Sequence, residues 1–415
     1  MSTPKGYEGW SKQQLIDKLR ELEATNEDEP KVEKTNTKKK TKKFDFSKYH
    51  TRFVAIRFAY LGWNYNGLAF QFEDTPLPTV EEQILKALAT AKLVKDAEPG
   101  CCDFSRCGRT DKGVSAMNQV ISLRVRSDFS PEDQQLQSND DKEIPYIFIL
   151  NSILPPDIRV TAISLRPPPK FDARFSCEYR HYRYLIAKEG LDLDLLQAAA
   201  AKYKGSHDFR NFCKIDGSKQ ITNYRREIYH SQIIPWDDEF VMLDLKGSAF
   251  LWHQVRYMVA VILSIGQGHE QMSLIDNLFD VEKYPSKPNY ELANDVPLIL
   301  YDCVYPEMEW LVPSDFKRSF FKNSREYAKL NGQVLDYQLK AQVNKIMKQT
   351  VVKDEDKLVY SSDSGVINVG DGRGRNFKTY VPVLEREFGE TFEAVNERHK
   401  DKRKRRKLEQ VESIE

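Results

Sequence analysis

The chain has 415 residues, of which 40% are hydrophobic, 30% charged and 11% aromatic, a composition typical of a folded protein rather than a fibrous or disordered one. No apolar run reaches the roughly 18–20 residues that span a bilayer, and the first residues lack the apolar core of a secretory signal, so we expect an intracellular protein without a membrane partner. The formal net charge of +1 gives no prediction of nucleic-acid binding from the charge of the whole molecule.

Two basic segments lie within this nearly neutral chain. Residues 31–50 carry eight lysines against two acids, and residues 398–415 carry eight basic residues against four acids, which leaves residues 51–397 with a net charge of −6. Both basic segments have the composition of polyanion-binding tails, and solvated disorder is the alternative for each. The run KKKTKK at 38–43 also fits a nuclear import signal, so we expect the protein in the nucleus and the cytoplasm.

The sequence offers no pattern for a metal or a nucleotide cofactor. Its six cysteines include no CxxC pair and its seven histidines no HxxxH, so reduced structural thiols are the better interpretation. The segment GDGRGR (370–375) lacks both the spacing and the strand–helix context of a dinucleotide-binding loop, and we interpret it as a turn. We therefore expect no metal and no cofactor.

The first half of the chain shows clear local patterns. Residues 11–25 place three leucines at helical spacing and predict a short amphipathic helix, and the lysine-rich residues 26–48 predict a linker. A strand is expected at 53–60, a helix from the capping box of Thr79 and Glu82 to about Val94, and a strand at 121–126. Further along, 127–143 predicts a polar surface loop, and the three prolines at 167–169 predict a domain junction.

The second half alternates in the same way. Residues 179–187 and 239–250 predict strands, residues 251–266 predict a strongly apolar helix that stops at Gly266, and a further helix is expected near 326–348. These patterns predict an α+β protein made of two α/β halves with a cleft between them. The expected segments are 1–50 as helix and linker, 51–166 as the N-terminal half, 167–305 as the C-terminal half, 306–397 as a helical and turn-rich extension, and 398–415 as a basic tail.

Catalytic chemistry is suggested by the segment CGRTDKG (107–113). Glycines on both sides of Asp111 permit a tight backbone path, which would present a short carboxylate from a rigid loop with Arg109 two residues away. Composition alone leaves an alternative open, because RTDKG is also what an ordinary exposed hairpin turn looks like.

Four segments together resemble one family. GRTDKGVSA (108–116) resembles the first and most diagnostic motif of the TruA-type tRNA pseudouridine synthases, and YLGWNYNG (60–67) resembles their opening strand and loop. ARFSCEYRHYRYLI (173–186) and GSAFLWHQVRYMVA (247–260) resemble their second and third motifs. The resemblance covers roughly residues 51–305 and implies the pseudouridine synthase fold, with a central, largely antiparallel sheet and an active-site cleft.

The resemblance also implies roles for individual residues. Asp111 falls on the catalytic aspartate, and Arg109 on the arginine that enters the RNA stack and helps to hold the target base out of it. Tyr182 falls on the tyrosine that stacks on the target uracil, and Arg256 on the basic residue that pairs with the aspartate. The resemblance thus implies an isomerase that converts uridine to pseudouridine in RNA without a cofactor.

Substrate and assembly follow from one branch of this family. Phrases such as HDFRNFCKIDGSKQIT (207–222) and FLWHQVR (250–256) resemble the eukaryotic branch that acts at positions 38 and 39 of the tRNA anticodon stem-loop. Bacterial members have asparagine or histidine and then methionine where this chain has His253 and Gln254, which puts the bacterial target positions in doubt. Members of the family are often dimers, so a homodimer is expected.

Three interpretations remain open at this point. An isomerase requires a group that manages the electron-poor sugar while the base turns, which suits a carboxylate acting either on C1′ or on the C2′ proton. A non-catalytic RNA-binding protein or chaperone would retain the basic tails and Tyr182 but gain nothing from Asp111. A glycoside or nucleoside hydrolase would normally use paired acids, and no second acid accompanies Asp111 in the matched motifs.

Overall fold

The computed structural model describes residues 10–14, 16–18, 44–316, 320–352, 365–373, 375–376 and 379–412. Internal contacts divide the chain into two units, Met1–Asp45 and Phe46–Glu415. In the first unit, residues 12–14 and 16–18 are helical, as expected for part of 11–25. The rest of that helix, and the lysine run at 38–43, lie outside the described residues.

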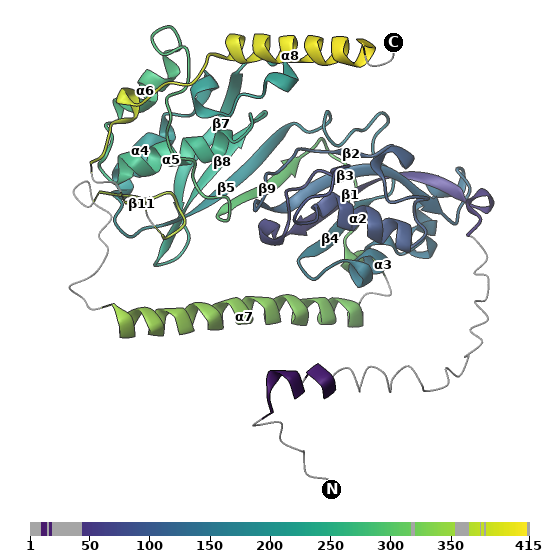
Figure 1. The fold of residues 1–415 in the computed structure, drawn as a ribbon. Helices are drawn as coiled ribbons and strands as arrows, with labels where there is room; N and C mark the ends of the chain where they lie inside the picture. Colours follow the sequence, from purple (N-terminus) through teal and green to yellow (C-terminus); the bar gives the residue numbers. More distant parts are fainter. Residues whose placement is uncertain are drawn as a thin grey trace. The chain divides into compact units, whose positions relative to one another are not determined.

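One large mixed sheet forms the centre of the second unit (Figure 1). Its strands run in the order β4-β1-β3-β9-β5-β8-β7-β6, with β2 paired to β3. Every pairing is antiparallel except that of β3 with β9. The strands are β1 (His50–Tyr60), β2 (Ser105–Arg106), β3 (Ser115–Ser127), β4 (Ile158–Ser164), β5 (Tyr179–Ala187), β6 (Gly205–Asp208), β7 (Arg225–Pro235), β8 (Phe240–Gly247) and β9 (Leu298–Val304).

Helices pack against this sheet in two groups. Helices combined with a sheet that has one parallel pairing confirm the α+β class and the largely antiparallel sheet expected from the sequence. A second, two-stranded sheet pairs β10 (Val366–Ile367) with β11 (Arg375–Asn376). The helices of the second unit are α2 (Val80–Thr90), α3 (Tyr146–Ile153), α4 (Leu193–Ala201), α5 (Gln254–Gly266), α6 (Ser273–Phe279), α7 (Phe320–Val351) and α8 (Phe392–Glu412).

Two hydrophobic clusters form the core, one on each side of the central strands. The first joins β1, β3 and β4 to α2 and α3, and the second joins β5 and β8 to α4, α5 and α6. Alternation along β1 explains the first cluster, because Val54, Ile56, Phe58 and Tyr60 point to one face and are buried. Tyr182 on β5 packs against both clusters and so lies where the two halves meet.

Several local predictions are confirmed in detail. Thr79 and Glu82 form the expected capping box, and the helix they open ends at Thr90, earlier than the expected Val94. The apolar helix runs from Gln254 and ends at Gly266 as predicted. At 370–375, Gly370 and Gly372 have positive φ values, in agreement with a turn.

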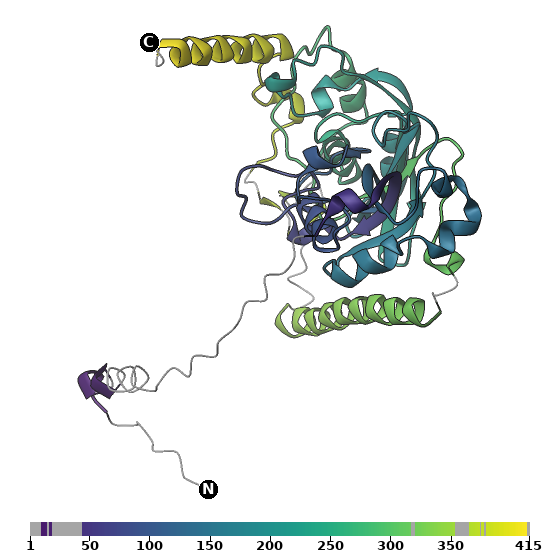
Figure 2. The ribbon, with the colours of Figure 1, turned by 90° about the vertical axis from the view of Figure 1, so that its right-hand side faces the viewer.

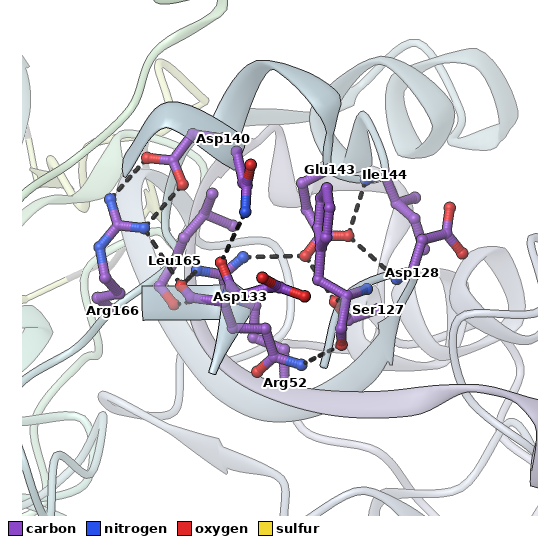
Figure 3. Close-up of polar contacts among 12 residues, drawn as sticks. Arg52, Ser127, Asp128, Asp133, Asp140, Glu143, Ile144, Leu165 and Arg166 are labelled. Carbon is purple, nitrogen blue, oxygen red and sulfur yellow. Dashed lines mark hydrogen bonds and ion pairs between the residues drawn. The ribbon is translucent and has the colours of Figure 1, made fainter. Parts of the chain in front are cut away.

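The segment 127–143 lies largely at the surface, as expected, but it is anchored at one end by a buried acid. It contains two 3-10 helices, Asp133–Gln135 and Gln137–Lys142, and it buries the Glu143 side chain. Figure 3 shows why: the Glu143 carboxylate accepts hydrogen bonds from Ser127 Oγ (2.6 Å) and from the Ile144 amide (2.9 Å), and it pairs with Arg52 (2.9 Å). The prediction missed only this anchor, because a polar composition does not reveal that a carboxylate has a buried partner 91 residues away.

Other elements had no local signal or a misleading one. The helices α3, α4 and α6 and the strands β7 and β9 were not predicted. The basic tail expected at 398–415 is instead helical, since α8 begins at Phe392 and continues to Glu412. Nowhere in the described part of the chain is a helix both long and apolar enough to cross a bilayer.

Candidate active site

Asp111 lies in the loop between β2 and β3. The Val114 amide donates to the Asp111 carbonyl (3.2 Å), which closes a turn with Gly113 at a φ of +81°. A side chain on Gly113 would be strained there, and its Cβ would lie 2.7 Å from Cγ of Asp295. The glycine therefore allows the turn and also admits a second acid to the site.

The loop is held rigidly by the segment that follows β1. Tyr60 and Thr110 share a buried hydrogen bond between their hydroxyls (2.6 Å), and the Leu68 amide donates to the Thr110 carbonyl (3.2 Å). A Cβ on Gly62 would lie 2.0 Å from the carbonyl oxygen of Val114, so the two segments touch backbone to backbone. These contacts fix the direction of the Asp111 side chain.

The Asp111 carboxylate meets the residues that precede α5. Trp252 Nε1 donates a hydrogen bond to Asp111 Oδ1 (3.2 Å), and His253 Nε2 lies 3.4 Å from Asp111 Oδ2. The Asp111 side chain keeps 28% of its surface exposed. The carboxylate is thus partly buried and still accessible from one side.

His253 is a neutral neighbour of Asp111. It precedes α5 with a left-handed backbone (φ +62°), an unusual conformation for a residue other than glycine. Burial, together with the charges of Arg256 and Lys214, lowers the pKa of His253 to about 4. The contact between His253 and Asp111 is therefore not an ion pair at neutral pH.

Arg256 lies in the first turn of α5 but makes no direct ion pair with Asp111. Its Nε donates to the carbonyl oxygen of Ala293 (2.7 Å), and its Nη2 is 4.0 Å from Asp295 Oδ2. The resemblance implied a direct pair with the aspartate. In this structure the guanidinium acts on Asp111 through its charge, across a longer distance.

The net effect of these neighbours is a raised pKa for Asp111. Burial is the largest cause, and the nearby Asp295 adds to it. The Arg256 charge, the Trp252 hydrogen bond and the Lys214 charge oppose the rise. Lys214 belongs to the same group, because its amide donates to the Trp252 carbonyl (2.9 Å) and its ammonium lies 4.5 Å from the Trp252 ring centre.

Tyr182 approaches the site from β5. Its ring meets Phe250 edge to face, with 4.9 Å between the ring centres. Burial, with the charge of Asp111 among the further causes, raises the pKa of Tyr182 well above its usual value. The described residues provide no hydrogen bond to its hydroxyl, and the phenol is protonated at neutral pH.

Arg109 is the predicted site residue that stands apart. Its side chain is exposed on the loop, and no other described residue forms a hydrogen bond or ion pair with it. The structure therefore groups Asp111, Tyr182 and Arg256 through charge and packing, and it leaves Arg109 free at the rim. The side chains of Cys, His, Asp and Glu in the described ranges form no cluster of three that could hold a metal.

Sequence reasoning missed four residues that the structure places at Asp111. Trp252 and His253 were noted only as parts of a motif, and Lys214 and Asp295 were not singled out. Lys214 and Asp295 lie more than 100 residues from Asp111 in the chain. The one available signal was the apolar helix after Trp252. A buried helix places the residues before its first turn against a neighbouring element.

Comparison with known proteins identifies the class. Residues 199–306 match the family described as tRNA pseudouridine synthase. This match covers α4 to β9, including Arg256 and the residues that contact Asp111 from the C-terminal half.

The most similar proteins extend the match over most of the chain. The tRNA pseudouridine(38/39) synthase of Saccharomyces cerevisiae is 49% identical over 96% of this chain and 92% of its own length. The tRNA pseudouridine(38/39) synthase of Homo sapiens is 41% identical over 72% of this chain and 65% of its own length. The tRNA pseudouridine synthase A of Methanococcoides burtonii is 31% identical over 62% of this chain and 85% of its own length. The chain therefore belongs to the TruA-type tRNA pseudouridine synthases, which confirms the resemblance, and it is an isomerase.

Proposed function

We propose that this protein converts uridine to pseudouridine at positions 38 and 39 of the tRNA anticodon stem-loop, with Asp111 as the catalytic residue. The names of the yeast and human relatives support the target positions. The observation that carries the assignment of Asp111 is its setting: a partly exposed carboxylate on a rigid loop, with a raised pKa, between Trp252 and His253.

The reaction breaks the N1–C1′ bond, turns the uracil and forms the C5–C1′ bond, after which the C5 proton leaves. Asp111 either adds to C1′ or removes the C2′ proton, and both routes need the carboxylate as an anion. The Arg256 charge and the Trp252 hydrogen bond stabilise this anion and oppose the effect of burial on the Asp111 pKa. The neutral His253 takes up space beside the carboxylate without competing as a cation.

Tyr182 and Arg109 serve the base rather than the sugar. A target uridine must leave its stack, which costs a few kcal/mol, and stacking on an aromatic ring returns about 1–3 kcal/mol. The Tyr182 ring is held by Phe250 and provides such a surface, and its protonated hydroxyl lies near Asp111. The exposed Arg109 side chain is free to enter the space that the uridine leaves in the RNA.

The deciding experiment maps pseudouridine in tRNA. Unmodified tRNA from cells that lack this protein is incubated with the purified enzyme, and the product is read by carbodiimide-dependent primer extension. We expect new stops at positions 38 and 39 only. Modification at other positions would overturn the proposed target while leaving the chemistry intact.

A second measurement separates an enzyme from an RNA-binding protein. The wild-type protein should release tritium from tRNA that carries 5-tritiated uridine, because the C5 proton is lost in the reaction. Asp111→Ala should release none and still bind tRNA with an affinity within about threefold of wild type, since the change removes only one small side chain. Tritium release by this variant would show that another group carries the chemistry.

We also propose that the protein acts in both the nucleus and the cytoplasm, supported by the lysine run at 38–43. Replacing the five lysines of this run by glutamine in a fluorescent fusion should reduce the nuclear signal. An unchanged distribution would refute the role of this run.

A homodimer is the assembly we propose. The helix α5 cannot mediate it alone, because its apolar residues are buried within the fold. The helix α7 instead exposes Leu339, Val343 and Ile346. Sedimentation equilibrium should give about twice the monomer mass, and a wild-type protein that stays monomeric at micromolar concentration would exclude the dimer.

A further inference from the structure

Helix α8 begins near the active site. Its first residues, 392–396, are called its root below. Its first turns pack on the C-terminal half, where the Phe392 ring lies 5.0 Å from that of Tyr224. Gln220 donates to the Asn396 carbonyl (3.0 Å), and Asn396 donates to the carbonyl of Ile221 (3.0 Å). The start of α8 is therefore fixed in position by both side-chain and backbone contacts.

A short loop connects this root to Asp111. The amide of Lys214 bonds to the Trp252 carbonyl, and Trp252 in turn donates to Asp111. Three residues further on, Gly217 lies against α8 so closely that a Cβ there would be 2.8 Å from the Val395 carbonyl oxygen. Three residues span at most about 10 Å, so the contact between Gly217 and α8 lies within about 10 Å of Lys214.

Beyond its root, α8 is exposed to solvent and rich in positive charge. Residues 400–406 are all exposed, and six of these seven residues are lysine or arginine. No ion pair joins any of these six to another described side chain. Figure 2 shows the C-terminal turns extending away from the neighbouring elements. At about 1.5 Å per residue, the six charges extend over about 10 Å.

This arrangement is unfavourable for the protein alone. Lys402 and Arg406 are four residues apart, and Lys402 and Arg405 three, so like charges face one another along the helix. Like charges at these spacings destabilise a helix, and a partner of opposite charge relieves that repulsion. A polyanion does this, because its phosphates neutralise the charges and release counterions.

Apart from the lysine-rich residues 31–50, this helix is the main concentration of positive charge in the chain. Residues 51–397 have a net charge of −6, so the body of the enzyme does not attract RNA as a whole. A substrate whose target uridine reaches Asp111 must place other phosphates near the root of α8. The cationic turns begin four residues beyond Asn396, and at about 1.5 Å per residue they extend to roughly 15 Å from it along the helix.

We propose that α8 is a phosphate-binding arm that contacts the tRNA substrate outside the stem-loop carrying the target uridine. This inference rests on the proposed function, since it takes the RNA at Asp111 to be the RNA at α8. The arm increases affinity for the whole tRNA and leaves the chemical step unchanged.

The test uses one charge-removing variant of the full-length protein and a matched control. The α8 variant carries Lys402→Gln, Arg403→Gln, Arg405→Gln and Arg406→Gln. The α7 control carries Lys329→Gln, Lys340→Gln, Lys345→Gln and Lys348→Gln, which removes the same charge from another exposed helix. Each protein is assayed with whole tRNA and with an isolated anticodon stem-loop RNA.

We expect KM for whole tRNA to rise at least about tenfold in the α8 variant at 150 mM salt, with kcat unchanged. The slope of log affinity against log salt should become shallower by about three, since each lost phosphate contact removes about 0.7–0.9. Kinetics on the isolated stem-loop should stay within about twofold of wild type, which also shows that the variant is folded. The α7 control should behave as wild type in all of these assays.

Three results would overturn the inference. They are an unchanged KM for whole tRNA, an equal loss on the isolated stem-loop, and an equal loss in the α7 control. Wild-type activity keeps this inference separate from the proposed function. If the wild-type enzyme forms no pseudouridine in tRNA, the proposed function fails. If the wild type is active and the α8 variant is unaffected, only the proposed role of α8 is refuted.

Discussion

Two pairs of opposite charge, one in the N-terminal half and one at the candidate site, differ in how fully their hydrogen-bonding groups are satisfied. Arg52 and Glu143 are almost fully buried, and the three guanidinium nitrogens of Arg52 bond to Glu143 and to the carbonyls of Gln134 and Leu165 (Figure 3). Asp111 and Arg256 also lie on neighbouring elements, but they do not meet. The carboxylate receives one side-chain hydrogen bond, from Trp252, and the guanidinium turns to Ala293.

The contrast separates a pair that stabilises the fold from a pair that we propose takes part in the reaction. A fully satisfied buried pair holds its loop to the sheet and has no capacity for a ligand. A carboxylate that is buried but only partly bonded has a raised pKa and free lone pairs, and such groups mark functional sites. Four variants test this difference, in order of decreasing expected effect.

The largest effect is expected from Asp111→Asn. Activity should fall by at least about 10⁴-fold, the scale seen when a catalytic group is removed. The folded state should not lose stability. A raised pKa in the folded state means that folding disfavours the carboxylate, so stability falls as the pH rises through that pKa, and the neutral amide avoids this cost. Tritium release and thermal melting at pH 7 check both expectations, and a lower melting temperature would contradict the second.

Glu143→Ala should show the opposite pattern. It leaves the Arg52 charge buried without its partner, which typically costs about 3–5 kcal/mol of unfolding free energy. Activity of the folded protein should stay within about twofold of wild type. Denaturation in urea measures the loss. The control, Asp103→Asn, breaks the exposed pair with Arg124 and should cost less than about 1 kcal/mol.

Arg256→Gln should lower kcat/KM about 10²-fold near pH 7, the scale of one lost electrostatic contact to a reacting group. The Arg256 charge lowers the pKa of Asp111, so its removal raises that pKa further, and a smaller fraction of the carboxylate is charged at a given pH. The acidic limb of the pH profile should therefore move to higher pH. Arg256→Lys, which retains the charge, should leave the limb in place. A limb that stays put in both variants would show that Arg256 does not act on Asp111.

Trp252→Phe should have the smallest effect. It removes one hydrogen bond to Asp111, worth about 0.5–1.5 kcal/mol, and should reduce kcat/KM by about two- to tenfold. The acidic limb should move in the same direction as for Arg256→Gln but less far. Trp236→Phe, at an exposed turn remote from these contacts, is the matched control. Equal effects of the two changes would rule out a role for the Trp252 hydrogen bond.

Local chemistry made part of this structure predictable. The capping box at Thr79, the alternation in β1 and the stop at Gly266 each depend on residues within one or two turns of one another. The motif around Asp111 was predicted for a different reason, because its resemblance to a family joins segments that are distant in the chain.

What the sequence did not reveal depends on distant contacts. Glu143 is buried because Arg52 meets it, and α8 forms where its root packs on Tyr224. The surroundings of Asp111 were missed in the same way, since Lys214 and Asp295 approach it only after the sheet is complete. Composition describes each of these segments as polar, and polarity alone does not distinguish a solvated loop from a paired one.

The central position of β9 sets an order of events during synthesis. This strand, Leu298–Val304, lies between β3 and β5 and pairs with both, so it is the link between the two parts of the sheet. A nascent chain that has not yet exposed these residues contains Asp111 and Arg256 but lacks the strand that brings their halves together. The two halves can therefore join into one sheet only after almost three quarters of the protein has left the ribosome.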